Sequence, residues 1–218
     1  MKMKNKVIEA IEKEKIVVIV RGVARDRLLS LCEAMYDGGI RLLEITYDAS
    51  GRVSDEQTAE NIKMLADAFR GRMFIGAGTV LTEKQVELTK NAGGSFIISP
   101  NTDGAVIKKT VELGLVSMPG ALTPTEIKAA HDFGADFVKL FPADCFGPAY
   151  VKAVKAPLNH IRLTVVGGIN EENIASYLKA GASGFGVGTN IVNKTFIENG
   201  EFDKITELAK KYVEVING

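Results

Sequence analysis

Apolar and polar positions alternate along the chain in two rhythms. Short runs rich in β-branched residues are separated by amphipathic segments of about 10 to 15 residues, which is typical of successive βαβ units around a parallel sheet. The short runs predict eight strands, at residues 16–20, 42–46, 74–78, 96–99, 116–119, 137–140, 163–166 and 184–187. The amphipathic segments predict a short N-terminal helix and then helices at 24–37, 55–69, 82–91, 103–113, 123–132, 148–156, 171–180 and 202–216.

Helix boundaries carry their own signals. Thr82, Thr123 and Asn170 precede acidic or amide side chains and are expected to cap helix N-termini. Glycine recurs between a helix and the next strand, as at Gly181, where a left-handed cap suits it. Eight βα units predict an α/β fold, a single-domain TIM (β/α)₈ barrel spanning residues 1–218. An open doubly wound sheet remains the alternative, because the pattern does not show closure.

Composition narrows the classes of partner. The chain has 218 residues, 46% of them apolar, and 27 basic residues balance 27 acidic ones, which suits one globular domain. No basic cluster with interleaved aromatic residues indicates nucleic-acid binding. No apolar run reaches the roughly 18 residues of a membrane span, and the N-terminus lacks a signal-peptide core. We therefore expect a cytoplasmic protein that acts on small molecules.

Cysteine and histidine are too sparse for a metal centre. The two cysteines, Cys32 and Cys145, lack zinc-site spacing, and His131 and His160 lie far apart in the sequence. Cys32 falls in the apolar stripe of a predicted helix and is expected in the core. Cys145 lies in a predicted loop, where a reactive role is the less favoured interpretation. We expect neither a metal nor a cofactor.

Two ionisable residues interrupt predicted strands that are otherwise apolar. Lys139 lies within Phe137-Val138-Lys139-Leu140, and Glu44 lies within Leu42-Leu43-Glu44-Ile45-Thr46. Burial favours the neutral amine of a lysine, which is the form that attacks carbonyl groups, and a nearby carboxylate moves protons. The pair therefore predicts a nucleophile with a general acid/base. The alternatives are a lysine that extends to the barrel mouth and a structural Lys–Glu ion pair.

Glycine-rich turns follow the last two predicted strands. Gly167-Gly168 comes directly after the seventh strand, and Gly188-Thr189-Asn190 after the eighth. Backbone amides in these two loops commonly hold a phosphate in (β/α)₈ barrels. The turns predict a phosphorylated ligand without specifying a reaction, and the alternative is that the glycines only make tight turns.

Thr79 and Arg21 are candidate binding residues at the barrel mouth. Thr79 ends the segment Gly76-Ala77-Gly78-Thr79 after the third strand, and Arg21 follows the first strand. A hydroxyl and a guanidinium there suit a carboxylate or phosphate. Both residues could instead be structural.

These residues carry a resemblance that covers nearly the whole chain. The order and spacing are similar to those of the 2-keto-3-deoxy-6-phosphogluconate and 4-hydroxy-2-oxoglutarate aldolases for the motifs Glu44-Ile45-Thr46, Gly76-Ala77-Gly78-Thr79-Val80-Leu81, Ile98-Ser99-Pro100, Pro119-Gly120, Lys139-Leu140-Phe141-Pro142 and Gly167-Gly168-Ile169. The resemblance implies a homotrimer of barrels that reversibly cleaves a 4-hydroxy-2-keto acid into pyruvate and an aldehyde without metal. The aldehyde would be glyceraldehyde 3-phosphate or glyoxylate.

The resemblance also implies roles for individual residues. Lys139 resembles the Schiff-base lysine, Glu44 the general acid/base, and Thr79 a residue that contacts the pyruvate moiety. Phe141 is expected beside the imine. Pro119 is expected to contact substrate, and the phosphate site is expected at Gly167, Gly168, Gly188, Thr189 and Asn190.

Two positions depart from the pattern of well-known members. Asp48 stands where they carry an arginine, and Val165-Val166 where they carry Pro-Thr. Arg21 is the candidate to replace the missing cation, and Asp48 is expected to face solvent or a neighbouring chain. Arg21-Gly22 and the valine before Gly167 are similar to the relatives that cleave the galactonate-derived epimer. An isomerase or epimerase of the phosphate-binding barrels and a non-catalytic sugar-phosphate-binding barrel are the alternative functions.

Overall fold

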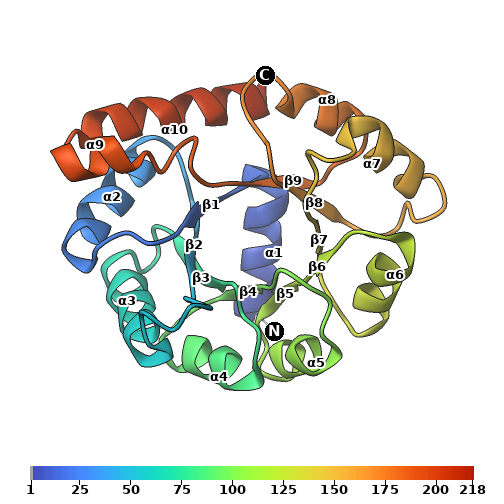
Figure 1. Cartoon of the computed structure of the whole chain (residues 1–218), viewed down its shortest axis with the longest axis horizontal. Helices are drawn as coiled ribbons and strands as arrows, with labels where there is room; N and C mark the ends of the chain where they lie inside the picture. Colours follow the sequence, from blue (N-terminus) through green and yellow to red (C-terminus); the bar gives the residue numbers. More distant parts are fainter. Residues whose placement is uncertain (1) are drawn as a thin grey trace.

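The computed structural model describes residues 2–218 and shows one ring of parallel strands. The nine strand segments are β1 (Ile16–Val20), β2 (Leu42–Thr46), β3 (Phe74–Gly78), β4 (Phe96–Ile98), β5 (Val116–Met118), β6 (Gly120–Ala121), β7 (Val138–Leu140), β8 (Leu163–Val166) and β9 (Gly184–Val187). They pair in the order β5-β4-β3-β2-β1-β9-β8-β7-β6. Because β5 and β6 are separated only by Pro119, they act as one barrel strand, which closes the ring (Figure 1).

Helices surround the ring on its outside except for α1, which lies across one end of it; Figure 1 shows α2 to α8 in chain order around the strands, with α9 and α10 between α8 and α2. Their bounds are α1 (Lys2–Glu14), α2 (Arg25–Asp37), α3 (Asp55–Ala68), α4 (Glu83–Asn91), α5 (Gly104–Glu112), α6 (Pro124–Asp132), α7 (Gly147–Lys155), α8 (Ile174–Lys179), α9 (Lys194–Asn199) and α10 (Phe202–Asn217). The single-chain barrel predicted from the alternating pattern is thus confirmed, and the open doubly wound sheet is excluded by the closed ring.

Three local predictions need correction. The predicted strand 116–119 is interrupted at Pro119, because proline has no N–H to donate to a ladder. The helix predicted to begin at 171 begins at Ile174, since Asn170 first caps a preceding turn through the backbone N–H groups of Glu172 and Asn173. Helix α9 was not predicted; its six residues are too few to show a helical period.

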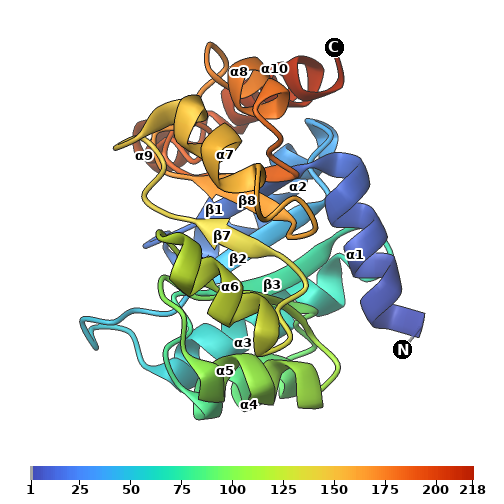
Figure 2. The same cartoon turned by 90° about the vertical axis from the view of Figure 1, so that its right-hand side faces the viewer.

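Helix α1 covers the amino-terminal end of the barrel, and Figure 2 shows it at one end of the molecule while the loop between β2 and α3 projects from the other. Val7 and Ile11 of α1 pack with strand side chains of the barrel interior, including Phe96 and Phe137. Cys32 is fully buried in the surrounding helix–strand core, as predicted. The amino-terminal end is therefore filled with apolar side chains, which leaves the opposite end for polar groups.

Candidate active site

A pocket of about 340 Å³ opens at the carboxyl-terminal ends of the strands. Barrel enzymes place their active sites at this face, because the loops that follow the strands converge there. The structure brings together in this pocket Arg21, Glu44, Thr79, Lys139, Phe141, Gly167, Gly168, Gly188, Thr189 and Asn190. Residues far apart in the sequence therefore share one cavity.

Lys139 is the middle residue of β7, and its side chain is 8% exposed. Strand register places Gly120 on one side of it and Thr164 on the other. Its Nζ lies 4.8 Å from the centroid of the Phe141 ring. Burial lowers the pKa of the Lys139 ammonium more than the charge of Glu44 raises it. The shift is towards the neutral amine, which is the nucleophilic form.

Glu44 occupies the centre of β2 and is 2% exposed. Burial raises the pKa of its carboxyl group, while the positive charges of Lys139 and Arg21 lower it to a smaller extent. The net direction is upward, towards the pH range in which a carboxyl group both accepts and donates protons. The same burial thus pushes the two pKa values towards each other.

Two glycines of β3 explain the Gly76-Ala77-Gly78 motif in physical terms. A Cβ on Gly78 would lie 1.6 Å from Glu44 Oε1, and a Cβ on Gly76 would lie 2.3 Å from Cδ2 of Phe96. Gly78 therefore provides the space for the Glu44 carboxylate, whereas Gly76 provides space for a core ring. The motif leaves room for the Glu44 carboxyl group because its glycines have no side chains.

Arg21 and Thr79 lie together at the same end of the pocket. An Arg21 guanidinium N–H donates to Thr79 Oγ1 at 3.0 Å. Thr79 has a φ of 55°, in the left-handed region that non-glycine residues adopt at a cost and that is enriched at functional sites. Arg21 also acts electrostatically on Lys139 and Glu44. This end of the pocket consequently combines a buried amine, a buried carboxyl group, a hydroxyl and a guanidinium.

The other end of the pocket consists of the two turns after β8 and β9. Gly167 and Gly168 have φ values of 107° and 67°, which only glycine adopts readily in succession. Among residues 2–218, no acceptor is bound by the backbone N–H groups of Gly168, Thr189 and Asn190. The Asn190 side-chain amide donates to the Ile169 carbonyl at 2.9 Å and so links the two turns. Successive free N–H groups of this kind suit an anion.

Comparisons with known proteins agree with this geometry. A family described as KDPG and KHG aldolase matches residues 7–208, where KDPG is 2-keto-3-deoxy-6-phosphogluconate. The chain belongs to this aldolase family. It is 36% identical to the 2-dehydro-3-deoxy-6-phosphogalactonate aldolase of Escherichia coli over 177 residues, covering 81% of this chain and 83% of that one.

A second sequence relative and a solved structure belong to the same kind of aldolase. The 2-dehydro-3-deoxy-phosphogluconate aldolase of Haemophilus influenzae is 30% identical over 213 residues, with 97% of each chain covered. The KDPG aldolase of Legionella pneumophila, with pyruvate captured at low pH as a covalent carbinolamine intermediate, superposes with a TM-score of 0.83 at 26% identity. That match covers 93% of this chain and 96% of the other. The enzyme class follows: this chain is an aldehyde-lyase of the KDPG aldolase type.

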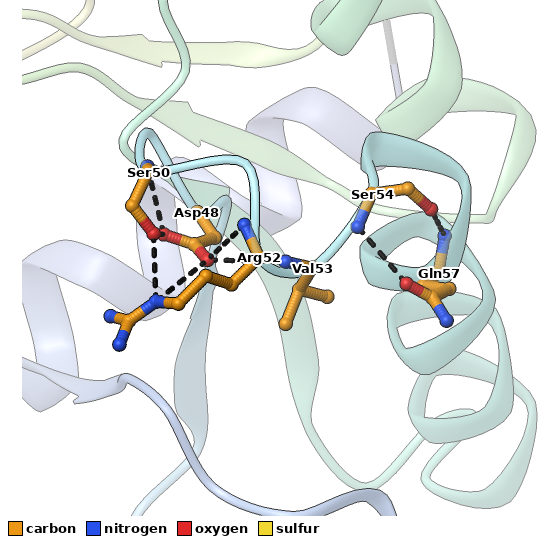
Figure 3. Close-up of polar contacts among 6 residues, drawn as sticks. All are labelled: Asp48, Ser50, Arg52, Val53, Ser54 and Gln57. Atoms are coloured by element: carbon orange, nitrogen blue, oxygen red, sulfur yellow. Dashed lines mark hydrogen bonds and ion pairs between the residues drawn. The ribbon is translucent and has the colours of Figure 1, made fainter.

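Asp48, the departure from the usual family arginine, turns into its own loop (Figure 3). Its carboxylate accepts hydrogen bonds from the Ser50 backbone N–H and hydroxyl at 2.9 and 2.6 Å, and from the N–H groups of Arg52 and Val53 at 3.1 Å each. These bonds, that of the Ser50 hydroxyl first, lower the pKa of Asp48 to about 2. Asp48 is half-buried in this network, which agrees only in part with the expectation that it faces solvent. The alternative, that it faces a neighbouring chain, stays a prediction.

The structure does not bring Pro119 to the pocket. Pro119 is buried between β5 and β6, and its carbonyl accepts the Lys139 backbone N–H at 2.8 Å. The prolyl side chain at the pocket is that of Pro100. Pro119 thus supports the backbone of the strand that carries Lys139.

Lys194 also lines the pocket and was not predicted. The available sequence signal was Asn193, which caps α9.

A second hollow, of about 490 Å³, lies at the amino-terminal end beside α1. Its lining is basic, but Lys4 and Arg70 are held by Asp136 and Asp67 at 2.9 and 2.6 Å. The strand residues that line it are the apolar Phe74 and Ile75. Among its described lining residues, this hollow has no counterpart of the buried Lys139 and Glu44 at the mouth.

None of the helices within residues 2–218 has the length and apolar character that a membrane span requires.

Proposed function

We propose that this aldolase cleaves a 2-keto-3-deoxy-6-phospho sugar acid through a Schiff base on Lys139, with Glu44 as the proton carrier. The observation that carries the proposal is the burial of Lys139 and Glu44 together at the pocket floor, with pKa values shifted in opposite directions. A purely structural ion pair does not need to line a pocket. Lys139 and Glu44 line a pocket that also contains a hydroxyl, a cation and free backbone N–H groups.

The reaction follows from the chemistry of these groups. The neutral Lys139 amine adds to the C2 carbonyl of the substrate, and the carbinolamine loses water to give a protonated imine. Glu44 accepts the proton of the C4 hydroxyl while the C3–C4 bond breaks and its electron pair passes into the imine to form an enamine. The aldehyde leaves. Protonation of the enamine at C3 and hydrolysis then return pyruvate and the free amine.

The two ends of the pocket suit the two anionic ends of such a substrate. Arg21 and Thr79 lie beside the lysine and are the candidates to hold the substrate carboxylate. The turns at Gly167-Gly168 and Gly188-Asn190 are the candidates for the phosphate. A 2-keto acid phosphorylated at its far end is the ligand class that this arrangement supports.

We further propose that the galactonate-derived epimer is the preferred substrate. Two observations support this. The identity to the phosphogalactonate aldolase is higher than that to the phosphogluconate aldolase, and Val166 lines the pocket where well-known family members carry a threonine. Steady-state assays of both phosphorylated epimers and of 4-hydroxy-2-oxoglutarate would rank them. Family resemblance also supports a homotrimer, which light scattering would test.

Borohydride reduction in the presence of pyruvate tests the mechanism directly, because it converts an imine into a stable amine. We expect one pyruvyl adduct per chain, located on Lys139 by mass spectrometry of the peptides. Lys139→Ala should lose both the adduct and at least about 10⁴-fold in turnover, while Lys152→Ala, an exposed lysine on α7, should retain both. Turnover of the wild type without an adduct, or an adduct on another lysine, would exclude the proposed mechanism.

A further inference from the structure

The end of the pocket formed by the turns at Gly167-Gly168 and Gly188-Asn190 is called the phosphate end. Among its described lining residues, one has a charged side chain, Lys194. Lys194 is the first residue of α9, and Asn193 fixes the start of that helix by accepting the Phe196 backbone N–H at 3.2 Å. The loop Gly188–Val192 leads directly into it, and Gly188 accepts two backbone hydrogen bonds within the loop. The origin of the Lys194 side chain is thus fixed relative to the glycine turns.

Lys194 is also free of competing partners. Among residues 2–218, it forms no ion pair with an acidic side chain, whereas Lys204 on α10 is held by Glu201 at 2.9 Å. Its charge is therefore available to a ligand. The remaining cations of the pocket, Arg21 and Lys139, belong to the opposite end, where they act on Glu44.

An acidic side chain that is exposed to solvent, that of Asp144, lies beside this end of the pocket. A Cβ on Gly168 would lie 2.5 Å from Cβ and 3.4 Å from Oδ2 of Asp144, so the Asp144 side chain lies against the glycine turn. A carboxylate beside an anion site repels a phosphate dianion. Backbone N–H groups carry only partial charges, and they must bind the phosphate against this repulsion. Lys194 supplies the full positive charge that offsets Asp144.

We propose that Lys194 is a phosphate-specificity residue: its ammonium pairs with the phosphate of the substrate and makes the pocket select phosphorylated over unphosphorylated 2-keto acids. This inference rests on the proposed aldolase function for its substrate. It predicts a defined division of labour, in which the lysine on β7 forms the covalent bond and the lysine on α9 recognises the far end of the substrate.

The test compares Lys194→Ala and Lys194→Arg with Lys210→Ala, an exposed lysine of α10 outside the pocket. Lys194→Ala should raise KM for the phosphorylated substrates by about ten- to a hundredfold, the range of a charge-assisted hydrogen bond, with a much smaller change in kcat. Lys194→Arg should restore most of the binding, because it retains the charge. The rate of pyruvate trapping by borohydride, which involves no phosphate, should stay within about twofold of wild type.

Calorimetric titration with inorganic phosphate keeps this test independent of turnover. Lys194→Ala should bind phosphate at least about tenfold more weakly than the wild type and Lys210→Ala. Equal losses on phosphorylated and unphosphorylated substrates, or unchanged phosphate affinity, would overturn the assignment of Lys194. Failure of the wild type to trap pyruvate would instead refute the Schiff-base proposal and leave the phosphate titration to decide the role of Lys194.

Discussion

The two ends of the mouth pocket are built on opposite principles. Lys139 and Glu44 project from the middle of strands, are almost fully buried, and are held in register by neighbouring strands. The phosphate end consists of glycine turns and the start of a six-residue helix, where Thr189 and Lys194 are exposed. Reactivity needs a low dielectric and fixed geometry, which strands supply. Recognition of a mobile, hydrated dianion needs accessible donors, which loops supply.

Under the proposed mechanism, the strand end controls the chemistry and the loop end controls which substrate is held. Variants at only one end of the pocket would test whether imine formation and substrate binding can be altered separately. A variant in the two glycine turns or at Lys194 that slows imine formation as strongly as cleavage would contradict this division.

Glu44→Gln should have the largest effect of the variants that keep the nucleophile. We expect a loss of about 10²- to 10⁴-fold in kcat, because proton transfer is removed, while some pyruvate remains trappable on Lys139. Glu44 raises the pKa of Lys139, so its removal should lower that pKa further and move the midpoint of the pH profile of trapping towards lower pH. Near-normal kcat would reduce Glu44 to a structural partner.

Gly78→Ala should damage catalysis through geometry alone. Its Cβ would collide with Glu44 Oε1, so the carboxylate must move, and we expect kcat to fall by about a hundredfold. Gly76→Ala is the matched control, because its Cβ meets Phe96 in the barrel core. That variant should lose about 1–3 kcal/mol of unfolding free energy, measured by denaturant titration, with a smaller loss of kcat in the folded enzyme. The reverse ranking in kcat would contradict the role given to Gly78.

Arg21→Ala and Asp48→Asn should reduce activity less than the variants above. Of the two, only Arg21→Ala should cause a clear loss. Arg21→Ala should lose about ten- to a hundredfold in kcat/KM on all substrates if it holds the shared carboxylate, or only on phosphorylated ones if it holds the phosphate. Arg21 lowers the pKa of Lys139, so its removal should move the trapping profile towards higher pH, opposite to Glu44→Gln. Unchanged kcat/KM on every substrate would exclude Arg21 from anion binding.

Asp48→Asn serves as the comparison for Arg21→Ala at the same mouth. Among residues 2–218, its side chain accepts hydrogen bonds only from within the loop 48–53, so KM should change by less than about twofold. A tenfold lower KM would instead show that the Asp48 carboxylate repels the substrate.

The amino-acid sequence alone was enough to predict the barrel and the two charged residues, Lys139 and Glu44, that are buried in its pocket. Strand period, cap residues and the spacing of βα units predicted eight barrel strands, because local propensity and burial agree at each of them. Lys139 and Glu44 were visible for the opposite reason: a charged residue inside an apolar run is costly unless it has a partner or a function. The glycine turns after β8 and β9 were also predictable, since Gly167 and Gly168 require left-handed φ.

Tertiary structure alone decided which residues share the pocket and which do not. The family resemblance of the Pro119-Gly120 motif implied that Pro119 contacts substrate, but Pro119 is buried in the closed ring and Pro100 lines the mouth pocket. The sequence signal at Lys194 was weak, because a capping Asn193 before a short helix shows where the helix starts but not that the lysine lines the same pocket as Gly167 and Gly168. Sequence reports the cost of placing a residue in its own segment, whereas proximity between distant segments exists only once the barrel has closed.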